Sequence, residues 1–286
     1  TLIATTKELE LQVSSRSSKE KRQAPQHLVK VLTNFESTVI DDGWATYCLA
    51  YAWLQLVTFW SFLRGVYTTW ISPNSLVFYT ASVFRCSILQ TKTTGPAKRV
   101  RIRTVQISPE AFFQHKEWLE VGLSLWLAAS PDRQNFISLP SPDYTEFRKL
   151  GAEPQDRAAL TRRLIFWHGF QLEDDEEPKV VDIFVAASRF WTEHSSRSTL
   201  VSMARALRVP RPITDRMGWW AVGQHASDEY IRTYRVLISQ VQKQVATFVR
   251  SRLKDAFTPD IFGEDWVIID LAKFIQTKIP SASGEE

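Results

Sequence analysis

Residues 193–235 read EHSSRSTLVSMARALRVPRPITDRMGWWAVGQHASDEYIRTYR, and the rest of the chain can be interpreted outward from them. A His-x-x-Arg pair stands at His194 and Arg197, and Tyr230 follows later in the stretch. Residues three apart share one face of a helix, so the pair can act on one ligand. An arginine fork grips two phosphate oxygens at once, and a tyrosine hydroxyl can serve as a nucleophile. The stretch therefore carries the residue types that a phosphoryl-transfer site needs.

Four ordered pieces of this stretch carry a resemblance to a known family. They are His194-Ser195-Ser196-Arg197, Met203-Ala204-Arg205-Ala206, Gly218-Trp219 and Tyr230-Ile231-Arg232. In this order they resemble the tyrosine recombinases and integrases, and most of all the Cre-type site-specific recombinases. A single His-x-x-Arg pair is common on exposed helices, whereas four pieces in order are much more specific. The resemblance implies an α+β, mainly α-helical fold, with a tyrosine-recombinase-like catalytic domain and a small antiparallel β-hairpin or sheet.

The composition is that of a chain with room for one large domain or two small ones. A net charge of +4 permits a nucleic-acid partner without requiring one. Eleven Trp and seventeen Phe indicate a well-filled interior. The two cysteines, Cys48 and Cys86, lack metal-ligand spacing and lie in apolar or strand-like runs. We therefore expect no disulfide framework and a reducing compartment, the nucleus or the cytoplasm.

We expect the chain to be divided into three regions. Residues 1–42 are a basic polar arm or the remnant of an N-terminal DNA-clamping region, residues 43–255 are the catalytic domain, and residues 256–286 are a tail with a short helix that can contact a neighbouring subunit. The arm can be a solvated or disordered segment, or it can contact phosphates. In the resembling family a complete helical domain precedes the catalytic one. Too few residues stand here for a copy of it, so we expect it to be cut away or replaced.

A long apolar region, residues 43–84, contains Arg64 as its one formal charge. Each flanking stretch is near the length that spans a bilayer, so a membrane hairpin is one interpretation. Three observations argue against a membrane hairpin: the polar Gln55, the turn at residues 72–74, and the free-energy cost of placing an arginine in lipid. The favoured interpretation is a buried helix over residues 45–63 with Arg64 at its end, and no contact with a membrane.

An arginine placed among apolar residues needs a partner or a task. The resemblance makes Arg64 the first catalytic arginine, in the context Leu63-Arg64. The family usually has an acidic residue three positions later, but this chain has Tyr67 there. The carboxylate that would orient the arginine is thus missing or replaced.

Short β-prone runs at residues 76–78, 83–89 and 98–107, with a Gly-Pro turn at residues 95–96, predict a hairpin or a small three-stranded sheet. In the last run arginine alternates with aliphatic residues, so one strand face would carry several cations. We expect this face, together with Lys98, to bind the DNA backbone, although a charged edge strand would show the same pattern. The expected DNA-binding residues are Arg99, Arg101, Arg103 and Lys98.

Further helices are expected from apolar periodicity and capping residues. The Ser-Pro-Glu start at residues 108–110 predicts a helix to about residue 129, and residues 130–157 predict a loop with interrupted helix. Other predicted helices span residues 156–170, 180–191, 230–254 and 265–277. The acidic run at residues 173–177 lacks the spacing of a cation-binding loop and predicts a solvated turn.

The resemblance also implies a mechanism. Tyr230 attacks a DNA phosphate and forms a 3′-phosphotyrosyl bond, with release of a 5′-hydroxyl. Arg64 and Arg197 hold the non-bridging oxygens, and His194 and Trp219 complete the pocket. Lys92, which lies 28 residues after Arg64 in the hairpin, protonates the leaving oxygen. No nucleotide cofactor is expected, because the covalent bond keeps the energy for rejoining. The implied mechanism also requires no metal, which agrees with the lack of a His or Cys ligand cluster in the sequence.

Several alternatives stay open. Tyr234 competes with Tyr230 as nucleophile, Lys98 competes with Lys92, and Trp220 competes with Trp219. The implied function is site-specific cleavage and rejoining of double-stranded DNA, in recombination or integration, by a homotetramer on DNA. A non-catalytic DNA-binding protein derived from a mobile-element recombinase is one alternative, motivated by Tyr67 and the short N-terminal region. A type IB topoisomerase-like enzyme, which shares the tyrosine mechanism, is another.

Overall fold

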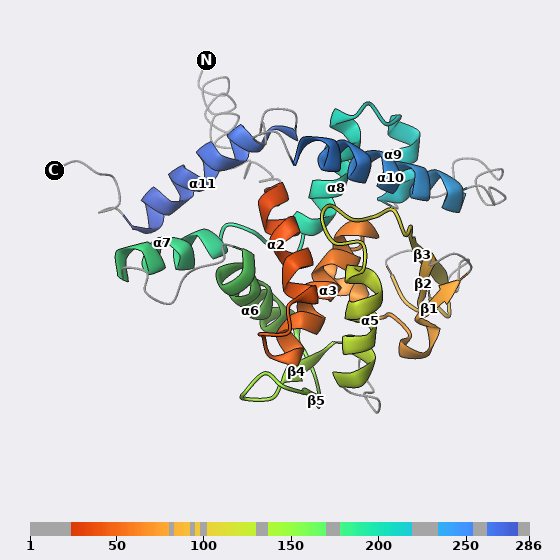
Figure 1. Cartoon of the computed structure of the whole chain (residues 1–286), viewed down its shortest axis with the longest axis horizontal. Coiled ribbons are helices and arrows are strands. Elements are labelled where there is room, and N and C mark those ends of the chain that lie inside the picture. Colours follow the sequence, from red (N-terminus) through yellow and green to blue (C-terminus); the bar gives the residue numbers. More distant parts are fainter. Residues whose placement is uncertain are drawn as a thin grey trace, which may run out of the picture.

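The computed structural model describes residues 24–79, 83–91, 95–97, 102–129, 137–169, 178–218, 234–253 and 262–279. Within these residues the fold is mixed α+β and mainly helical (Figure 1). The elements in chain order are α2 (Val29–Ile40), α3 (Thr46–Trp60), α4 (Gly65–Thr68), η1 (Pro73–Ser75), β1 (Val77–Tyr79), β2 (Val83–Ile88), β3 (Arg103–Ile107), α5 (Trp118–Ala129), β4 (Ser138–Pro140), β5 (Phe147–Gly151), α6 (Pro154–Leu164), η2 (Ile165–Gly169), α7 (Pro178–Ser188), α8 (Ser195–Ala206), α9 (Arg211–Met217), α10 (Tyr234–Arg252) and α11 (Glu264–Lys278).

Helix α3 is the centre of the core, as its uncharged sequence predicts. Both of its tryptophans, Trp53 and Trp60, are fully buried. A helix that is apolar on all sides must be surrounded by other elements, and α2, α5, α6 and α8 pack around it (Figure 1). The buried helix expected over residues 45–63 is therefore confirmed. Among the described residues, none of the helices combines the length and the apolar character that crossing a membrane requires.

Helices α3 and α5 approach each other closely at Gly122. A Cβ atom placed on this glycine would lie 2.1 Å from Cδ1 of Trp53, so no larger residue fits without a shift of the helices. The indole of Trp53 donates a 3.1 Å hydrogen bond to the carbonyl of Leu119 in the same helix as Gly122. The large ring of one helix thus fills the gap that the glycine leaves in the other.

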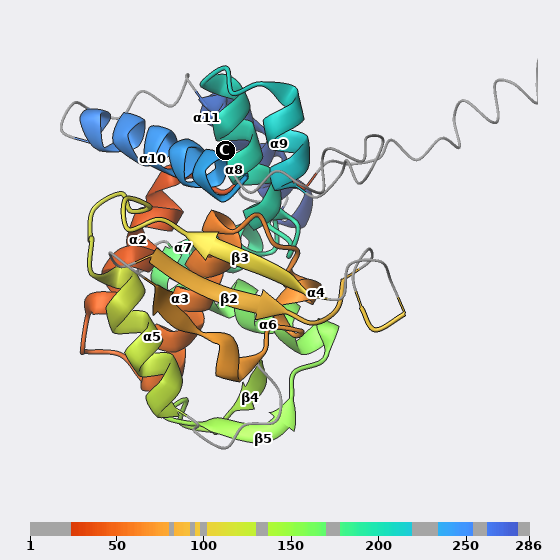
Figure 2. The same cartoon turned by 90° about the vertical axis from the view of Figure 1, so that its right-hand side faces the viewer.

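A three-stranded antiparallel sheet, in the order β1-β2-β3, lies beside these helices (Figure 2). In β2 the residues Phe84, Cys86 and Ile88 are buried and alternate with half-buried ones. The register places Ile88 opposite Arg103. The predicted small antiparallel sheet is confirmed, whereas Ile102, expected on an aliphatic face, is 56% exposed.

The helix expected from residue 108 begins only at Trp118. The carboxylate of Glu36 in α2 accepts hydrogen bonds from the backbone N–H groups of Phe113 (2.8 Å), Gln114 (2.7 Å) and His115 (3.2 Å). These N–H groups donate to a side chain of another helix and not to carbonyls of a helix of their own. The residues before Trp118 therefore form turns. A tertiary contact here overrides the local capping signal.

A second antiparallel pair, β4 with β5, lies where the sequence predicts a loop with interrupted helix. Its register pairs Ser138 with Gly151 and Pro140 with Phe147. The hydroxyl of Tyr47 in α3 donates to the carbonyl of Ser138 at 3.0 Å, and Phe147 packs against the Tyr47 ring at 4.5 Å. The hairpin is thus held by the core helix, which no local pattern in residues 130–157 indicates.

Both ends of the described chain pack onto the core. Helix α2 lies within the segment expected as an arm, and its buried side chains include Phe35, so part of that segment belongs to the packed core. Helix α11 matches the helix expected over residues 265–277. Glu264 at its start accepts a 2.6 Å hydrogen bond from the backbone N–H of Val29, which joins the two ends.

Candidate functional site

Arg64 stands at the end of a sharp turn that follows α3. Phe62 adopts a left-handed backbone conformation with φ of 58° and is nearly fully buried. This conformation is rare for a bulky residue and costs of order 1–3 kcal/mol, which the surrounding packing offsets. The chain reverses there, and Arg64 becomes the residue that precedes α4. The guanidinium of Arg64 lies 5.7 Å from the centre of the Tyr67 ring.

His194 and Arg197 are brought to the same place by the start of α8. His194 is exposed and precedes the first turn, while Arg197 lies in that turn and is 6% exposed. The Nη2 group of Arg197 donates a hydrogen bond to the carbonyl of Gly218. Two pieces of the motif, His-x-x-Arg and Gly-Trp, thus touch each other through this bond.

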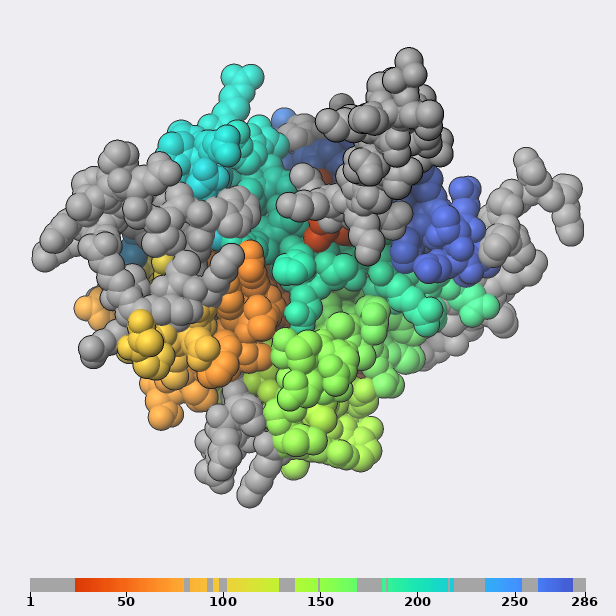
Figure 3. Space-filling view, turned by 180° about the vertical axis from the view of Figure 1, so that it is seen from behind, coloured from red at the N-terminus to blue at the C-terminus, as the bar shows by residue number. Residues whose placement is uncertain are grey.

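Arg64, His194 and Arg197 line one pocket of about 660 Å³. Arg64 and Arg197 are more than a hundred positions apart in the chain. Figure 3 shows the two regions side by side on one face, with the segment after α3 in orange and the start of α8 in teal. The other residues that line the pocket are Ala24, Pro25, Gln26, Ser198, Val201, Ser202 and Asp270.

The electrostatics of this pocket favour an anion. Burial and, to a smaller extent, the positive charge of Arg64 lower the pKa of Arg197 to about 10, while Tyr67 acts in the opposite direction. Two guanidinium groups held near each other repel unless an anion lies between them. The Nε atom of Arg64 is buried, and no described residue accepts its hydrogen. Asp270 of α11 contributes one carboxylate to the lining.

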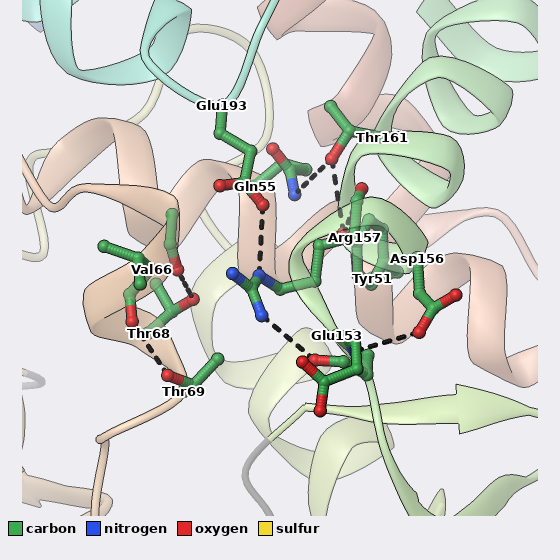
Figure 4. A network of polar contacts seen from close by, with 12 residues as sticks. Tyr51, Gln55, Val66, Thr68, Thr69, Glu153, Asp156, Arg157, Thr161 and Glu193 are labelled. Atoms are coloured by element: carbon green, nitrogen blue, oxygen red, sulfur yellow. Dashed lines mark hydrogen bonds and ion pairs between the residues drawn. The ribbon is translucent and has the colours of Figure 1, made fainter.

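An ion pair between Arg157 and Glu193 lies next to the His194 motif (Figure 4). Nε of Arg157 in α6 donates to Oε1 of Glu193 at 3.0 Å, and the Arg157 side chain is 5% exposed. Glu193 immediately precedes His194. Its Cβ and Cδ atoms would both lie 3.1 Å from a Cβ placed on Gly65, the residue that follows Arg64. Glu193 therefore packs between the segments that carry the two arginines, and the absence of a side chain at Gly65 allows this approach.

The same ion pair belongs to a larger network that reaches α3. Nη1 of Arg157 donates to the carbonyl of Ala152 at 3.0 Å. The hydroxyl of Tyr51 lies 3.2 Å from the carbonyl of Arg157 and 3.2 Å from the hydroxyl of Thr161 (Figure 4). The Arg157 side chain is buried in this network.

Residues 24–28 run beside α8, and the first three of them form one wall of the pocket. The backbone N–H of His27 donates to the Thr199 hydroxyl at 2.7 Å, and Nε1 of Trp191 donates to the carbonyl of Gln26 at 2.9 Å. Burial lowers the pKa of His27 to about 3, so this imidazole stays neutral beside the Ser196 hydroxyl. The segment is thus fixed by side chains of the helix that carries Arg197.

Several predicted site residues lie outside the described part of the chain. They are Tyr230, Lys92, Trp219, Lys98, Arg99 and Arg101, together with the competitor Trp220. Arg103 is described and begins β3 as a half-buried residue, so it is the member of the predicted cationic strand face that can be placed. Tyr234 begins α10.

Sequence reasoning did not select Glu193, Arg157 or Asp270. Glu193 adjoins the His194 motif, so its position was the one signal that could have indicated it. Arg157 lies in a helix whose apolar pattern is weak, and Asp270 lies in a helix about seventy positions beyond the motif. Both reach the site only through the packing of α6 and α11.

Comparison with known proteins gives no relative for this chain. It matches none of the protein-family models, curated proteins or solved structures with which it was compared.

Proposed function

We propose that this protein cleaves and rejoins double-stranded DNA through a tyrosyl-phosphate intermediate. The observation that carries the proposal is the meeting of Arg64 and Arg197 with His194 in one pocket. Two arginines that share a pocket form a fork-like site for the non-bridging oxygens of a phosphodiester. Support also comes from the order of the four motif pieces around Tyr230.

The proposed roles of Arg64, Arg197 and His194 rest on their places in the pocket, and those of the other residues rest on the motif. Arg64 and Arg197 hold the phosphate, and the unused Nε hydrogen of Arg64 is available to one of its oxygens. His194 is exposed at the pocket, where it can donate a proton or a hydrogen bond to the phosphate. Tyr230 is the proposed nucleophile, Lys92 the proposed general acid, and Trp219 completes the pocket.

A non-catalytic DNA-binding protein is the second candidate, and the environment of Arg64 favours it. The family's usual carboxylate is replaced by Tyr67, whose ring lies 5.7 Å from the Arg64 guanidinium. An aromatic ring attracts the cation but orients it less strictly than a bidentate carboxylate does. Such a site can retain phosphate binding after losing turnover.

Incubation with nicked duplex DNA tests the proposal. Because the target sequence is unknown, the substrate is a labelled pool of nicked duplexes with randomised cores. The nick lets the released strand diffuse away, so cleavage accumulates as a protein–DNA adduct that resists denaturant. We expect an adduct with the unmodified protein and with Tyr234→Phe, and none with Tyr230→Phe.

Each other outcome has a definite meaning. An adduct that survives Tyr230→Phe and disappears with Tyr234→Phe would assign the nucleophile to Tyr234. DNA binding without an adduct would support the non-catalytic candidate. A protein that neither binds nor cleaves the pool contradicts both. Peptide mapping of the adduct identifies the modified tyrosine directly.

The proposed partners follow from the same function. They are double-stranded DNA and further copies of this chain, assembled as a tetramer because strand exchange needs two duplexes held together. The two cysteines are free, and burial raises the pKa of the Cys86 thiol to about 12, so this thiol stays protonated. We propose the nucleus or the cytoplasm as the location of the protein, because free thiols persist in reducing compartments.

A further inference from the structure

A second cavity, of about 220 Å³, opens at the other end of α3. It lies between the beginning of α3, the end of α6, η2 and the loop before β5. An engineered apolar cavity of about 150 Å³ binds benzene, so this one has room for an aromatic ring with a small substituent. A π-helical turn such as η2 is rare and is often found at functional sites.

The walls of this cavity are mainly aromatic. Tyr47 and Tyr51 are buried in the floor, and their hydroxyls already donate to backbone carbonyls. Trp44 and Trp167 also line the cavity and are 42% and 40% exposed, so they stand near its mouth. Aromatic walls with a few polar groups are typical of small-molecule sites.

Two polar side chains in the lining, Arg163 and His168, keep hydrogen-bonding capacity that the described residues do not use. Arg163 contacts Tyr144 by a hydrogen bond to the hydroxyl and lies 4.6 Å from the ring centre, but it forms no ion pair with a described residue. His168 is 3% exposed and packs edge-on against Trp44 at 4.3 Å. No described residue hydrogen-bonds to the ring nitrogens of His168.

Among the described residues that line the cavity, Arg163 is the cation, and it has no carboxylate partner there. Asp143 also lines the cavity, but its carboxylate accepts from the Ser141 hydroxyl and from the backbone N–H of Thr145 at 3.3 Å. Burial lowers the pKa of His168 to about 4, opposed by Asp41, so its imidazole is neutral. A neutral imidazole can donate one hydrogen bond and adds no charge.

We propose that this cavity binds a small aromatic carboxylate, with its ring among the aromatic side chains and its carboxylate on Arg163. Ring burial supplies most of the affinity, and the guanidinium selects an anion over a neutral or cationic analogue. The neutral His168 offers a further hydrogen bond from the wall. A cation would be repelled by Arg163.

This site is separate from the phosphate pocket. Arg64 follows the carboxyl end of α3, whereas Trp44, Tyr47 and Cys48 lie at its amino end. A helix of this length spans about 22 Å at 1.5 Å per residue. The proposal therefore stands whether or not the protein cleaves DNA, and duplex DNA is not expected to compete for the cavity.

Isothermal titration of the whole chain with indole-3-acetate tests the proposal. We expect saturable binding of one molecule per chain, at least tenfold tighter than binding of neutral indole or cationic tryptamine. Arg163→Gln should weaken indole-3-acetate about tenfold and abolish its advantage over indole. Arg162→Gln removes the neighbouring exposed arginine, which does not line the cavity, and should change nothing.

A second variant covers the aromatic part of the site. Trp167→Ala should weaken indole-3-acetate and indole by a similar factor, because it removes ring contact and no charge. The absence of saturable binding up to millimolar concentrations, equal affinity for indole and indole-3-acetate, or an equal loss in Arg162→Gln would each overturn the proposal. Thermal melting of each variant shows whether a lost affinity reflects lost folding.

Discussion

Arg157 and Glu193 form an ion pair with a 3.0 Å separation between Nε and Oε1, and this pair joins α6 to the residue directly before His194. The side chain of Arg157 is 5% exposed and that of Glu193 is 23% exposed, so the interaction is shielded from water. Gly65 packs against the same glutamate from the other side. Glu193 thereby contacts both α6 and the segment that carries Arg64.

Removal of this carboxylate should destabilise the fold. In Glu193→Ala the buried Arg157 guanidinium loses its counter-charge, and breaking a buried pair in this way costs about 3–5 kcal/mol. We expect a loss of this size in the free energy of unfolding measured by urea titration. Asp215→Ala is the matched control, because its partner Arg211 is 79% exposed and such pairs contribute less than about 1 kcal/mol. Equal losses of unfolding free energy in the two variants would show that the buried pair contributes no more to stability than the exposed pair does.

The two pocket arginines should be required for adduct formation with nicked DNA. Arg64→Ala and Arg197→Ala each remove a fixed donor to the phosphate, so we expect the cleavage rate to fall about a hundred- to a thousand-fold. Arg197→Lys keeps the charge but loses the planar fork and should rescue only part of the rate. Arg205→Ala, an exposed arginine later in α8, should cleave normally. Normal cleavage by either alanine variant at the pocket would remove that arginine from the mechanism.

Glu36 should make stability depend on pH. Burial raises the pKa of its carboxyl group from 4.5 to about 7, although the backbone N–H groups of residues 113–115 and the Arg250 charge act against this. Between these two pH values the folded state binds more protons than the unfolded state, so stability falls as pH rises through the window. A shift of this size corresponds to roughly 3 kcal/mol.

The variant Glu36→Gln tests this dependence because the amide does not titrate. Urea unfolding at pH 5 and at pH 7.5 should show the variant gaining stability relative to the unmodified protein as pH rises. Glu264, whose pKa is also raised to about 7 by burial, is present in both proteins and cancels in the difference. If the free energies of unfolding of the two proteins changed in parallel with pH, Glu36 would already be ionised throughout this pH range.

Gln242 should be one of the most sensitive polar positions in the core. Its Nε2 donates to the carbonyls of Trp60 (2.7 Å) and Gln106 (3.1 Å), and its Oε1 accepts from the N–H of Ser108 (2.8 Å). Gln242→Leu leaves three backbone groups without these bonds, and each buried unsatisfied group costs about 1–3 kcal/mol. We expect a loss of at least about 3 kcal/mol in the free energy of unfolding.

The neighbouring glutamine in the same helix provides the control. Gln244 is exposed and donates one 3.2 Å bond to the carbonyl of Leu207. Its replacement in Gln244→Leu should change stability by less than about 0.5 kcal/mol, as for most surface substitutions. If Gln242→Leu proved equally mild, water would have to satisfy the three backbone groups.

Local pattern was sufficient where an element is decided by its own residues. The uncharged stretch around Trp53 predicted the buried helix α3, and the turn at Gly95 between β-prone runs predicted the sheet. Prediction from local pattern failed where a group far away in the sequence determines the local structure. The capping signal at residues 108–110 lost to the Glu36 carboxylate, and β4 with β5 depend on Tyr47 of α3.

By itself, the sequence determined the order of the motif around His194, Arg197 and Tyr230, on which the proposed chemistry depends. It also determined the central helix, since apolar residues on every side of a helix must be surrounded. Only the tertiary structure decided that Arg64 enters the same pocket as Arg197, and that the pair of Glu193 and Arg157 packs beside the residues next to them. The physical reason is that contacts between distant segments depend on the packing of whole helices, which a periodicity within one segment does not encode.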